Sequence, residues 1–393
     1  MKILIVHNDY GRYSGEEAVV DRMISNLSSL GYDVDTFRRT SQPYRDTLLG
    51  KTRGFFSGIY SIAGRRAMRR KLREFCPDII NIHNLYPFIS PAILPLCKKA
   101  GIPVVMTVHN YRLICPTGLF LRNGNPCENC LKNGNELDCI RYNCEHNRLR
   151  SLGYALRNAA ARKTKAYYNN VDCFCCLTEF QKEKLIAAGF DKTKIKVIPN
   201  YIDYRETSDK QLSECKTRYV GYVGRLSHEK GYDLLVEVAR RHPEIEFRFA
   251  GTLREDEQAP ELPNVKLCGQ LPQDQLAQFY DDSRFIVIPS RCYEGFPVAL
   301  LEASSHSRCC IAPDHGAFRE LMTNCENGET AGLLFRPNDI DDLEHKIVKL
   351  WNNTPQSIEL GAKAFRNYDK RFLKENIVTA WDKLLHRLVN DKR

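Results

Sequence analysis

Two cations in the C-terminal half of the chain are placed where a diphosphate could bind. Arg225 and Lys230 lie in the segment RLSHEKG, which follows the apolar run YVGYVG. We expect that run to be a strand, so both cations would stand in a loop at its carboxyl end. Lysine and arginine in loops more often face water, so this pair needs support from the rest of the chain.

Two glutamates follow further along the chain. Glu294 and Glu302 belong to the segment RCYEGFPVALLE, which comes after the expected strand RFIVIPS. Gly295 has no side chain to cover its backbone amide, and Pro297 is suited to the first position of a helix. Amide groups at a helix start point toward anions. Here they would be those of Gly295, Phe296 and Val298. Either glutamate could instead be an exposed helix acid.

The first expected loop, HNDYGRYSGEE, follows the apolar start KILIV and precedes a helix. It contains two glycines but lacks the G-x-G-x-x-G spacing of dinucleotide-binding loops, which disfavours NAD and FAD. Gly15 lies just ahead of the helix, where a missing side chain would let a phosphate or sugar approach the helix start. The alternative is an ordinary turn glycine.

The motif GRLSHEKG, followed by the E-x7-E pair with GFPVALLE between its glutamates, resembles the retaining family 4 glycosyltransferases of GT-B architecture, the glycosyl transferases group 1. The likeness extends over nearly the whole chain. It includes MTVHNY, with His109 at a strand end, and the segments VIPNYID, GAFRE and GLLF. The chain departs from the family pattern at Tyr201 and Ser14, where glycine is usual.

The resemblance implies a role for each motif residue. Arg225 and Lys230 would neutralise the donor diphosphate, and Glu302 would accept hydrogen bonds from the ribose. Glu294 would meet hydroxyls of the transferred sugar, and His109 would contact that sugar near the reacting carbon and help to order the acceptor. The expected catalytic residues are therefore His109, Arg225, Lys230 and Glu294. The expected donor-binding residues are Gly15, Arg225, Lys230, Gly251, Leu271, Glu294, Gly295, Phe296, Pro297, Val298 and Glu302, with the base held by the stretch from Gly251 to Leu271.

The chemistry of sugar transfer makes these residue types sensible. The leaving diphosphate gains negative charge while the sugar becomes oxocarbenium-like, so fixed cations stabilise the transition state. The family is generally pictured as retaining the anomeric configuration by same-face attack, with a phosphate oxygen taking the acceptor proton. No carboxylate is nominated by the sequence as a nucleophile, and no cofactor is expected for catalysis.

The resemblance predicts a UDP or GDP sugar as donor and a glycan or lipid-linked acceptor, in cell-surface polysaccharide or lipopolysaccharide biosynthesis. A nucleotide-sugar epimerase of the same fold is the alternative. A more distant alternative is a basic, zinc-containing nucleic-acid-binding protein, which would leave the E-x7-E pair unexplained. We expect no nucleic-acid partner.

Apolar runs alternate with helical segments along the chain, which indicates parallel sheets covered on both faces. One helix is expected over 152–169, and the last 40 residues are expected to be helical throughout. We expect an α/β GT-B fold of two doubly wound, Rossmann-like domains that face a central cleft. These are an acceptor-side domain over 1–200 with a cysteine-rich insertion at 115–146, a nucleotide-sugar-binding domain over 201–370, and a helix over 371–393 that packs back on the first domain.

The insertion contains four closely spaced cysteines in a loop rich in glycine and asparagine. Cys127, Cys130, Cys139 and Cys144 have the residue type and proximity of a structural zinc site, in which Cys115 or His146 could substitute. Plain reduced thiols or a disulfide are the alternatives. The insertion follows His109 directly, so it could shape the choice of acceptor.

The net charge of +10 is unevenly distributed. Residues 51–73 hold eight lysines and arginines and no acid, with aromatic and aliphatic residues ahead of the basic cluster. This pattern fits a segment on an anionic membrane surface, and equally a solvated helix beside a few core aromatics. The chain lacks a long apolar stretch and a signal-peptide core, so we expect a cytoplasmic protein, peripheral on the inner face of the plasma membrane if the segment binds lipid.

Overall fold

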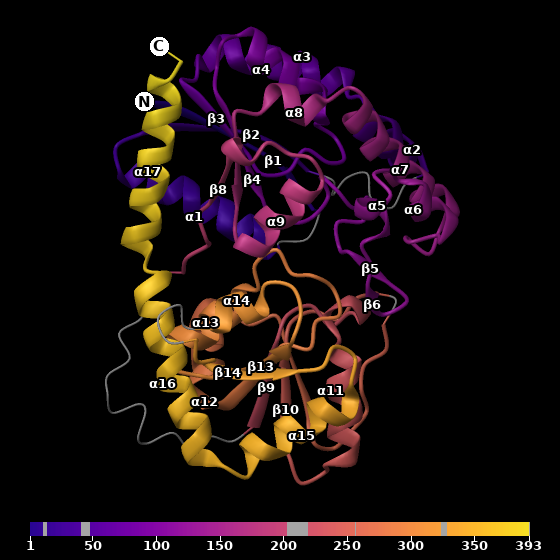
Figure 1. The fold of residues 1–393 in the computed structure, drawn as a ribbon, viewed down its shortest axis with the longest axis vertical. Helices are drawn as coiled ribbons and strands as arrows, with labels where there is room; N and C mark the ends of the chain where they lie inside the picture. Colours follow the sequence, from indigo (N-terminus) through magenta and orange to yellow (C-terminus); the bar gives the residue numbers. More distant parts are fainter. Residues whose placement is uncertain (11–13, 41–47, 203–218, 256, 324–327, 393) are drawn as a thin grey trace. The chain divides into compact units, whose positions relative to one another are not determined.

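The computed structural model describes residues 1–10, 14–40, 48–202, 219–255, 257–323 and 328–392, with the backbone alone for 48–53 (Figure 1). The chain divides into two compact units. The N-terminal unit comprises Met1–Leu119, Glu128–Pro199 and Val378–Arg393. The C-terminal unit comprises Phe120–Cys127 and Asn200–Ile377.

The N-terminal unit is built on a six-stranded parallel sheet in the order β2-β1-β3-β4-β7-β8. Its central strands are apolar and buried on both faces, as parallel sheets require. Winding reverses between β1 and β3, the kind of switch point where such sheets bind ligands. The strands are β1 (Lys2–Asp9), β2 (Asp33–Thr40), β3 (Ile79–Ile82), β4 (Val104–Val108), β7 (Cys173–Cys176) and β8 (Ile195–Val197).

Helices connect these strands, and the first begins with a capping box. Ser14 accepts a hydrogen bond from the amide of Glu17, and the Glu17 carboxylate accepts one from the amide of Ser14. Ser14, a departure from the family's usual glycine, therefore caps the helix. The helices are α1 (Gly15–Ser29), α2 (Leu48–Ile59), α3 (Ile62–Phe75), α4 (Leu94–Lys99), α7 (Arg148–Lys163), α8 (Ala166–Asn170) and α9 (Glu179–Ala187).

The expectation of one helix over 152–169 is wrong. The chain forms α7 and α8 with a break between them, because Lys165 adopts a left-handed backbone with φ of 49°. Ahead of α7, the cysteine-rich insertion forms only short elements. These are the hairpin strands β5 (Leu121–Arg122) and β6 (Asn125–Pro126), and the helices α5 (Asn129–Lys132) and α6 (Leu137–Arg141).

The C-terminal unit has a second six-stranded parallel sheet in the order β11-β10-β9-β12-β13-β14. Counted within the unit, this is the 3-2-1-4-5-6 order of the Rossmann fold, with its switch point between β9 and β12. The predicted fold class, two doubly wound parallel sheets, is confirmed. The strands are β9 (Tyr219–Val223), β10 (Phe247–Ala250), β11 (Val265–Gly269), β12 (Ser283–Val287), β13 (Cys310–Pro313) and β14 (Gly332–Phe335).

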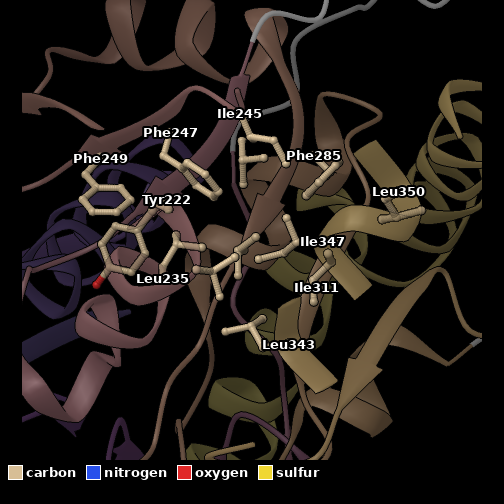
Figure 2. Close-up of a cluster of buried hydrophobic side chains, with 14 of the residues drawn as sticks. Tyr222, Leu235, Ile245, Phe247, Phe249, Phe285, Ile311, Leu343, Ile347 and Leu350 are labelled. Atoms are coloured by element: carbon tan, nitrogen blue, oxygen red, sulfur yellow. The ribbon is translucent and has the colours of Figure 1, made fainter. Parts of the chain in front are cut away.

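The core of this unit lies between the sheet and two of its helices (Figure 2). Phe247, Phe249 and Phe285 from the strands are fully buried, as are Leu235 from α11 and Ile347 from α15. The rigid sheet that results fixes the loops at its carboxyl edge. The helices are α11 (Tyr232–Arg241), α12 (Gln273–Asp282), α13 (Val298–Ser305), α14 (Phe318–Met322), α15 (Ile340–Trp351) and α16 (Thr354–Arg371).

The last helix, α17 (Lys374–Asn390), follows α16 after a break at 372–373, so the end of the chain is not one continuous helix. Its residues from Val378 onward group with the N-terminal unit. There Tyr32 Oη lies 2.9 Å from His386 Nε2, and just beyond the helix Lys392 pairs with Asp172 at 3.1 Å. Over the residues that the structure describes, no helix combines the length and the apolar character needed to cross a membrane.

Candidate active site

The loop after β9 lies close to the loop after β10 because of a glycine. Gly251 has φ of 149°, and a Cβ on this residue would stand 1.8 Å from the carbonyl oxygen of Gly224. A larger residue would therefore push the two loops apart. Gly251, expected from the sequence to contact the donor, has this structural reason for being glycine whatever it binds.

Arg225 stands in the β9 loop with its side chain about half exposed, at 54%. One of its guanidinium nitrogens donates to Glu229 Oε1 at 2.6 Å, and Arg254 donates to Glu229 Oε2 at 3.3 Å. Burial alone would raise the pKa of Glu229, but the Arg225 charge, hydrogen bonds and the Arg254 charge together outweigh it, and the pKa lies below its usual value. A buried carboxylate thus holds two guanidinium groups at the carboxyl end of the sheet.

Lys230 is fixed through the residue that follows it. Gly231 has φ of 70°, and a Cβ there would lie 2.0 Å from the carbonyl oxygen of Pro289. The turn His228–Lys230 is therefore held against the chain leaving β12, across the switch point. Lys230 Nζ donates to Glu294 Oε1 at 2.6 Å, and Arg225 is near enough for its charge to act on the Lys230 ammonium.

Glu294 lies at the centre of this network. Its Oε1 accepts from Ser290 Oγ as well as from Lys230, both at 2.6 Å. Burial opposes ionisation of Glu294, yet the Lys230 ammonium keeps the pKa of the carboxyl below its usual value. The pKa of Lys230 is correspondingly raised by Glu294 against the effect of burial. Both groups are charged at neutral pH.

His315, which the sequence motifs did not single out, borders the same network. Its Nε2 lies 3.0 Å from the carbonyl oxygen of Ser290, which can only accept, so the proton is on Nε2. Its Nδ1 is then an acceptor, buried and without a hydrogen-bond partner among the described residues. Burial lowers the pKa of His315, so the ring is neutral. His315 Nδ1 is thus a buried acceptor near Glu294 that can accept a hydrogen bond from a sugar hydroxyl.

The helix after Glu294 begins at Val298, one residue later than expected, with Pro297 at its N-cap. Gly295 and Phe296 are buried, and the Phe296 ring packs edge to face against Phe372 with centroids 5.9 Å apart. The Phe296 side chain is therefore core, and it can serve a donor only through its backbone. Leu271, in the turn between β11 and α12, is half-buried.

Glu302 lies within α13 and is held by a tyrosine from α12. Tyr280 Oη donates to Glu302 Oε2 at 2.7 Å, and the Tyr280 ring stacks on His306. Burial and then the Glu302 charge raise the pKa of Tyr280, so it stays a donor. Tyr280 positions one carboxylate oxygen of Glu302, a contact that sequence spacing does not reveal.

In the N-terminal unit, His109 follows β4 and contacts a second histidine at the end of β3. His109 Nε2 lies 2.7 Å from His83 Nδ1, and the rings are stacked with centroids 5.0 Å apart. Burial lowers the pKa of His109 to about 4 and that of His83 well below its usual value. Both rings are neutral at physiological pH and are joined by one N–H···N hydrogen bond, which couples their tautomers and orients His109.

Polar side chains from the first loop of this unit extend the region around His109. Tyr10 Oη donates to Glu16 Oε2 at 2.9 Å and accepts from Arg112 at 2.9 Å. Asn110 also reaches Glu16, at 3.5 Å. Among the described residues, no atom lies within 4 Å of the place that a Cβ on Gly15, at the start of α1, would occupy, so the space there is open.

The structure thus brings Arg225, Lys230 and Glu294 together, with Glu302 further along the helix that follows them. His109 and Gly15 belong to the other unit. Sequence reasoning missed Glu229, Arg254, Tyr280, His83 and His315. Two of these could have been found from the sequence. Glu229 lies between His228 and Lys230 in HEKG, and His83, like His109, directly follows an expected strand.

The four predicted zinc cysteines are divided between the two units. Cys127 groups with the C-terminal unit, and Cys130, Cys139 and Cys144 with the N-terminal unit. A hydrogen bond with Cys144, then burial, raises the pKa of Cys139. The nearby Cys115 raises this pKa further. In the described chain, no three of these cysteine sulfur atoms lie within 4.8 Å of one another. The one group of ligand atoms there that meets this distance belongs to His7, Asp9 and Glu17. The zinc site therefore remains a prediction.

Two family models match the chain. One, described as glycosyl transferases group 1, matches residues 203–367, and the other, glycosyltransferase family 4, matches residues 13–206. An uncharacterised glycosyltransferase of Methanocaldococcus jannaschii is 29% identical over 99% of both chains. The O-antigen chain mannosyltransferase C of Escherichia coli is 25% identical over 100% of both chains.

A solved structure with the same fold is that of Anabaena HepE in complex with UDP-glucose. It has a TM-score of 0.66 and 17% sequence identity, and the match covers 98% of this chain and 100% of HepE. These comparisons return glycosyltransferases, so they do not favour the epimerase alternative.

Proposed function

Because the chain belongs to the group 1, family 4 glycosyltransferases, we propose that it moves a sugar from a UDP or GDP sugar to a glycan or lipid-linked acceptor with retention of configuration. The observation that carries the proposal is the pairing of Lys230 with Glu294 beside Arg225, at the switch point of the C-terminal sheet. A role in cell-surface polysaccharide assembly is supported by the O-antigen relative.

Arg225 and Lys230 bind the diphosphate in this proposal, and their fixed charges stabilise the leaving group. Glu294, held in place by Lys230 and Ser290, accepts hydrogen bonds from hydroxyls of the transferred sugar. Glu302 accepts the ribose hydroxyls, and α13 supplies backbone amides for the phosphates. His109, oriented by His83, contacts the sugar near the reacting carbon. Gly15 and Leu271 complete the proposed donor-binding set with Gly251, Gly295, Phe296, Pro297 and Val298.

The donor can be identified by thermal unfolding of the full chain with UDP and GDP sugars. A ligand present at 100 times its dissociation constant adds about 2.7 kcal/mol to the free energy of unfolding. We expect one nucleotide series to raise the unfolding temperature and the other to have little effect. If no nucleotide sugar stabilises the chain, the proposed function is wrong.

The role of Glu302 can be separated from that of the phosphate site. Glu302→Ala is expected to weaken donor binding about 10- to 100-fold, because hydrogen bonds to a charged acceptor are lost. Tyr280→Phe is expected to have a smaller effect, because it only frees the carboxylate to move. Calorimetric titration with the nucleoside diphosphate and with inorganic pyrophosphate distinguishes the sites. Binding of pyrophosphate should not change in either variant, and a parallel loss for both ligands would contradict a ribose role.

We also propose that α2 and α3 bind an anionic membrane surface. Phe56, Tyr60 and Ile62 are exposed at 69%, 54% and 59%. Arg66, Arg69, Arg70 and Arg73 of α3 are exposed beside them, whereas the side chains of Lys51 and Arg53 lie outside the described residues. The helix α7, which packs on α2, adds exposed Leu149 and Leu156. Apolar side chains beside cations suit a lipid headgroup region.

Vesicle sedimentation tests this surface. Replacing Arg66, Arg69 and Arg70 with glutamate should abolish sedimentation with vesicles that contain phosphatidylglycerol, because about 1 kcal/mol of attraction is lost per cation. Arg65 is left unchanged because it is engaged by the carbonyl of Ala92. Glutamates at Lys99, Lys192 and Lys196, three exposed lysines of the same unit, serve as the control. Equal sedimentation of the two variants would refute the proposed surface.

A further inference from the structure

The first hairpin of the cysteine-rich insertion belongs to the C-terminal unit. The segment Phe120–Cys127 groups with that unit, whereas the chain on either side of it groups with the N-terminal unit. Its strands β5 and β6 are antiparallel, and the two residues between them, Asn123 and Gly124, have φ of 49° and 74°. Positive φ at both positions is what a two-residue type I′ turn requires. The insertion therefore contributes an ordered element to the unit that contains Lys230 and Glu294.

The tip of this hairpin is anchored by the side chain of Asn338. Asn338 Nδ2 donates to the carbonyl oxygen of Gly124 and, at 2.9 Å, to Asn125 Oδ1. Asn338 Oδ1 accepts from Arg291 Nε at 3.2 Å. One side-chain amide thus joins the hairpin tip to Arg291.

Arg291 is buried and holds the turn that carries Lys230. Its Nη1 donates to the carbonyl oxygen of His228 at 2.8 Å, and its backbone amide donates to the carbonyl oxygen of Glu229 at 3.0 Å. Its Nη2 donates to Asp233 Oδ2 at 2.6 Å. The hairpin tip is therefore linked through Asn338 and Arg291 to one wall of the candidate active site.

The base of the hairpin contacts the same segment through an aromatic pair. Phe120 is 1% exposed, and its ring packs edge to face on Tyr293 with centroids 5.8 Å apart. The Tyr293 ring also contacts the His315 ring, with centroids 5.4 Å apart. Tyr293 directly precedes Glu294 in the sequence, and His315 carries the buried Nδ1 acceptor. Phe120 thus packs on the residue that lies between the two groups suited to bind sugar hydroxyls.

The backbone of Phe120 supports a specific role for this contact. Its φ of 48° lies in the left-handed region, which is unfavourable for a residue with a Cβ and rare for an aromatic one. Residues persist in this region only where their surroundings fix them, and they gather at functional sites. Here the carbonyl oxygen of Phe120 accepts from the amide of Cys127 at 2.7 Å, which closes the base of the hairpin.

We propose, on the basis of the proposed function, that Phe120 is a positioning residue for the transferred sugar. Its ring holds Tyr293 in place, and Tyr293 fixes the positions of Glu294 and His315 around that sugar. The diphosphate and the ribose are assigned to other side chains. A change at Phe120 should therefore act on the sugar and spare the rest of the nucleotide.

Kinetics and calorimetric titration of the full chain test this role, with the nucleotide sugar chosen by the thermal screen and the matching nucleoside diphosphate. Phe120→Leu keeps an apolar side chain but removes the ring contact. We expect kcat/KM for the nucleotide sugar to fall about 10- to 100-fold, because the sugar is displaced from its reactive position. The dissociation constant of the nucleoside diphosphate should stay within about twofold of the wild-type value.

Phe247→Leu is the matched control. Phe247 is also fully buried in the C-terminal unit, but it begins β10, at the end of the strand opposite the site loops. We expect this variant to lose stability and to keep wild-type kcat/KM and nucleotide binding. A loss of sugar transfer equal to that of Phe120→Leu would show that general loosening of the unit, and not sugar positioning, causes the effect.

Asn338→Asp tests the hairpin without changing its own residues. The carboxylate still accepts from Arg291, but the donor to the hairpin tip is lost, so kcat/KM should fall at least about threefold with diphosphate binding unchanged. Unchanged kcat/KM in this variant or in Phe120→Leu would overturn the proposal, as would an equal loss of diphosphate binding. If the wild type binds no nucleotide sugar, the proposed function is wrong and the positioning role is refuted with it.

Discussion

Arg225→Ala is expected to lower kcat/KM for sugar transfer about 100- to 1,000-fold, the effect of removing one fixed donor from a developing negative charge. The free energy of unfolding should fall by about 1 kcal/mol or less. The side chain is about half exposed, and Glu229 keeps Arg254 as a partner when Arg225 is removed. Steady-state kinetics and thermal unfolding of the same preparation measure the two effects separately.

Arg240→Ala is the matched control for this variant. Arg240 is exposed at 58% and pairs with Glu237 within the same unit, so it loses a comparable surface ion pair. We expect wild-type kinetics from it. Near wild-type turnover in Arg225→Ala would contradict the assignment of this residue to the diphosphate.

Lys230→Met is expected to reduce both activity and stability. Activity should fall about 100- to 1,000-fold for the same electrostatic reason as for Arg225. The free energy of unfolding should fall by roughly 1–3 kcal/mol, because Glu294, exposed at 12%, is left without its ammonium partner. Since Lys230 keeps the pKa of Glu294 low, the pair stabilises the protein above the usual glutamate pKa. That contribution is lost as the pH falls through the lowered pKa.

The double variant Lys230→Met/Glu294→Gln separates the two effects. It removes the buried charge along with its partner, so most of the lost stability should return. Activity should not return, because both the phosphate cation and the charged sugar acceptor are absent. Recovery of turnover in the double variant would show that Lys230 serves only to neutralise Glu294.

The alternation of apolar runs and helices predicted both sheets, because parallel strands buried on two faces leave a strong signal in the sequence. The motif spacing also selected Arg225, Lys230 and Glu294. The contact between the last two residues was beyond sequence reasoning, because it depends on Gly231 approaching Pro289, distant along the chain. The break at Lys165 was missed because a left-handed lysine has no signature in residue type.

The histidines show the same limit in the N-terminal unit. His83 and His109 directly follow strands β3 and β4, and only knowledge that these strands are neighbours predicts their contact. The cysteine spacing favoured zinc, yet spacing cannot show whether the sulfur atoms converge. Chemistry that depends on strand order or on side-chain packing is where sequence reasoning stopped.

A crystal structure of the chain with the nucleoside diphosphate chosen by the thermal screen tests the central claim most directly. We predict that nitrogen atoms of Arg225 and Lys230 lie within about 3.2 Å of phosphate oxygens. The ribose hydroxyls should face Glu302. A diphosphate bound elsewhere on the C-terminal unit, with Lys230 still turned to Glu294 and away from the nucleotide, would contradict it.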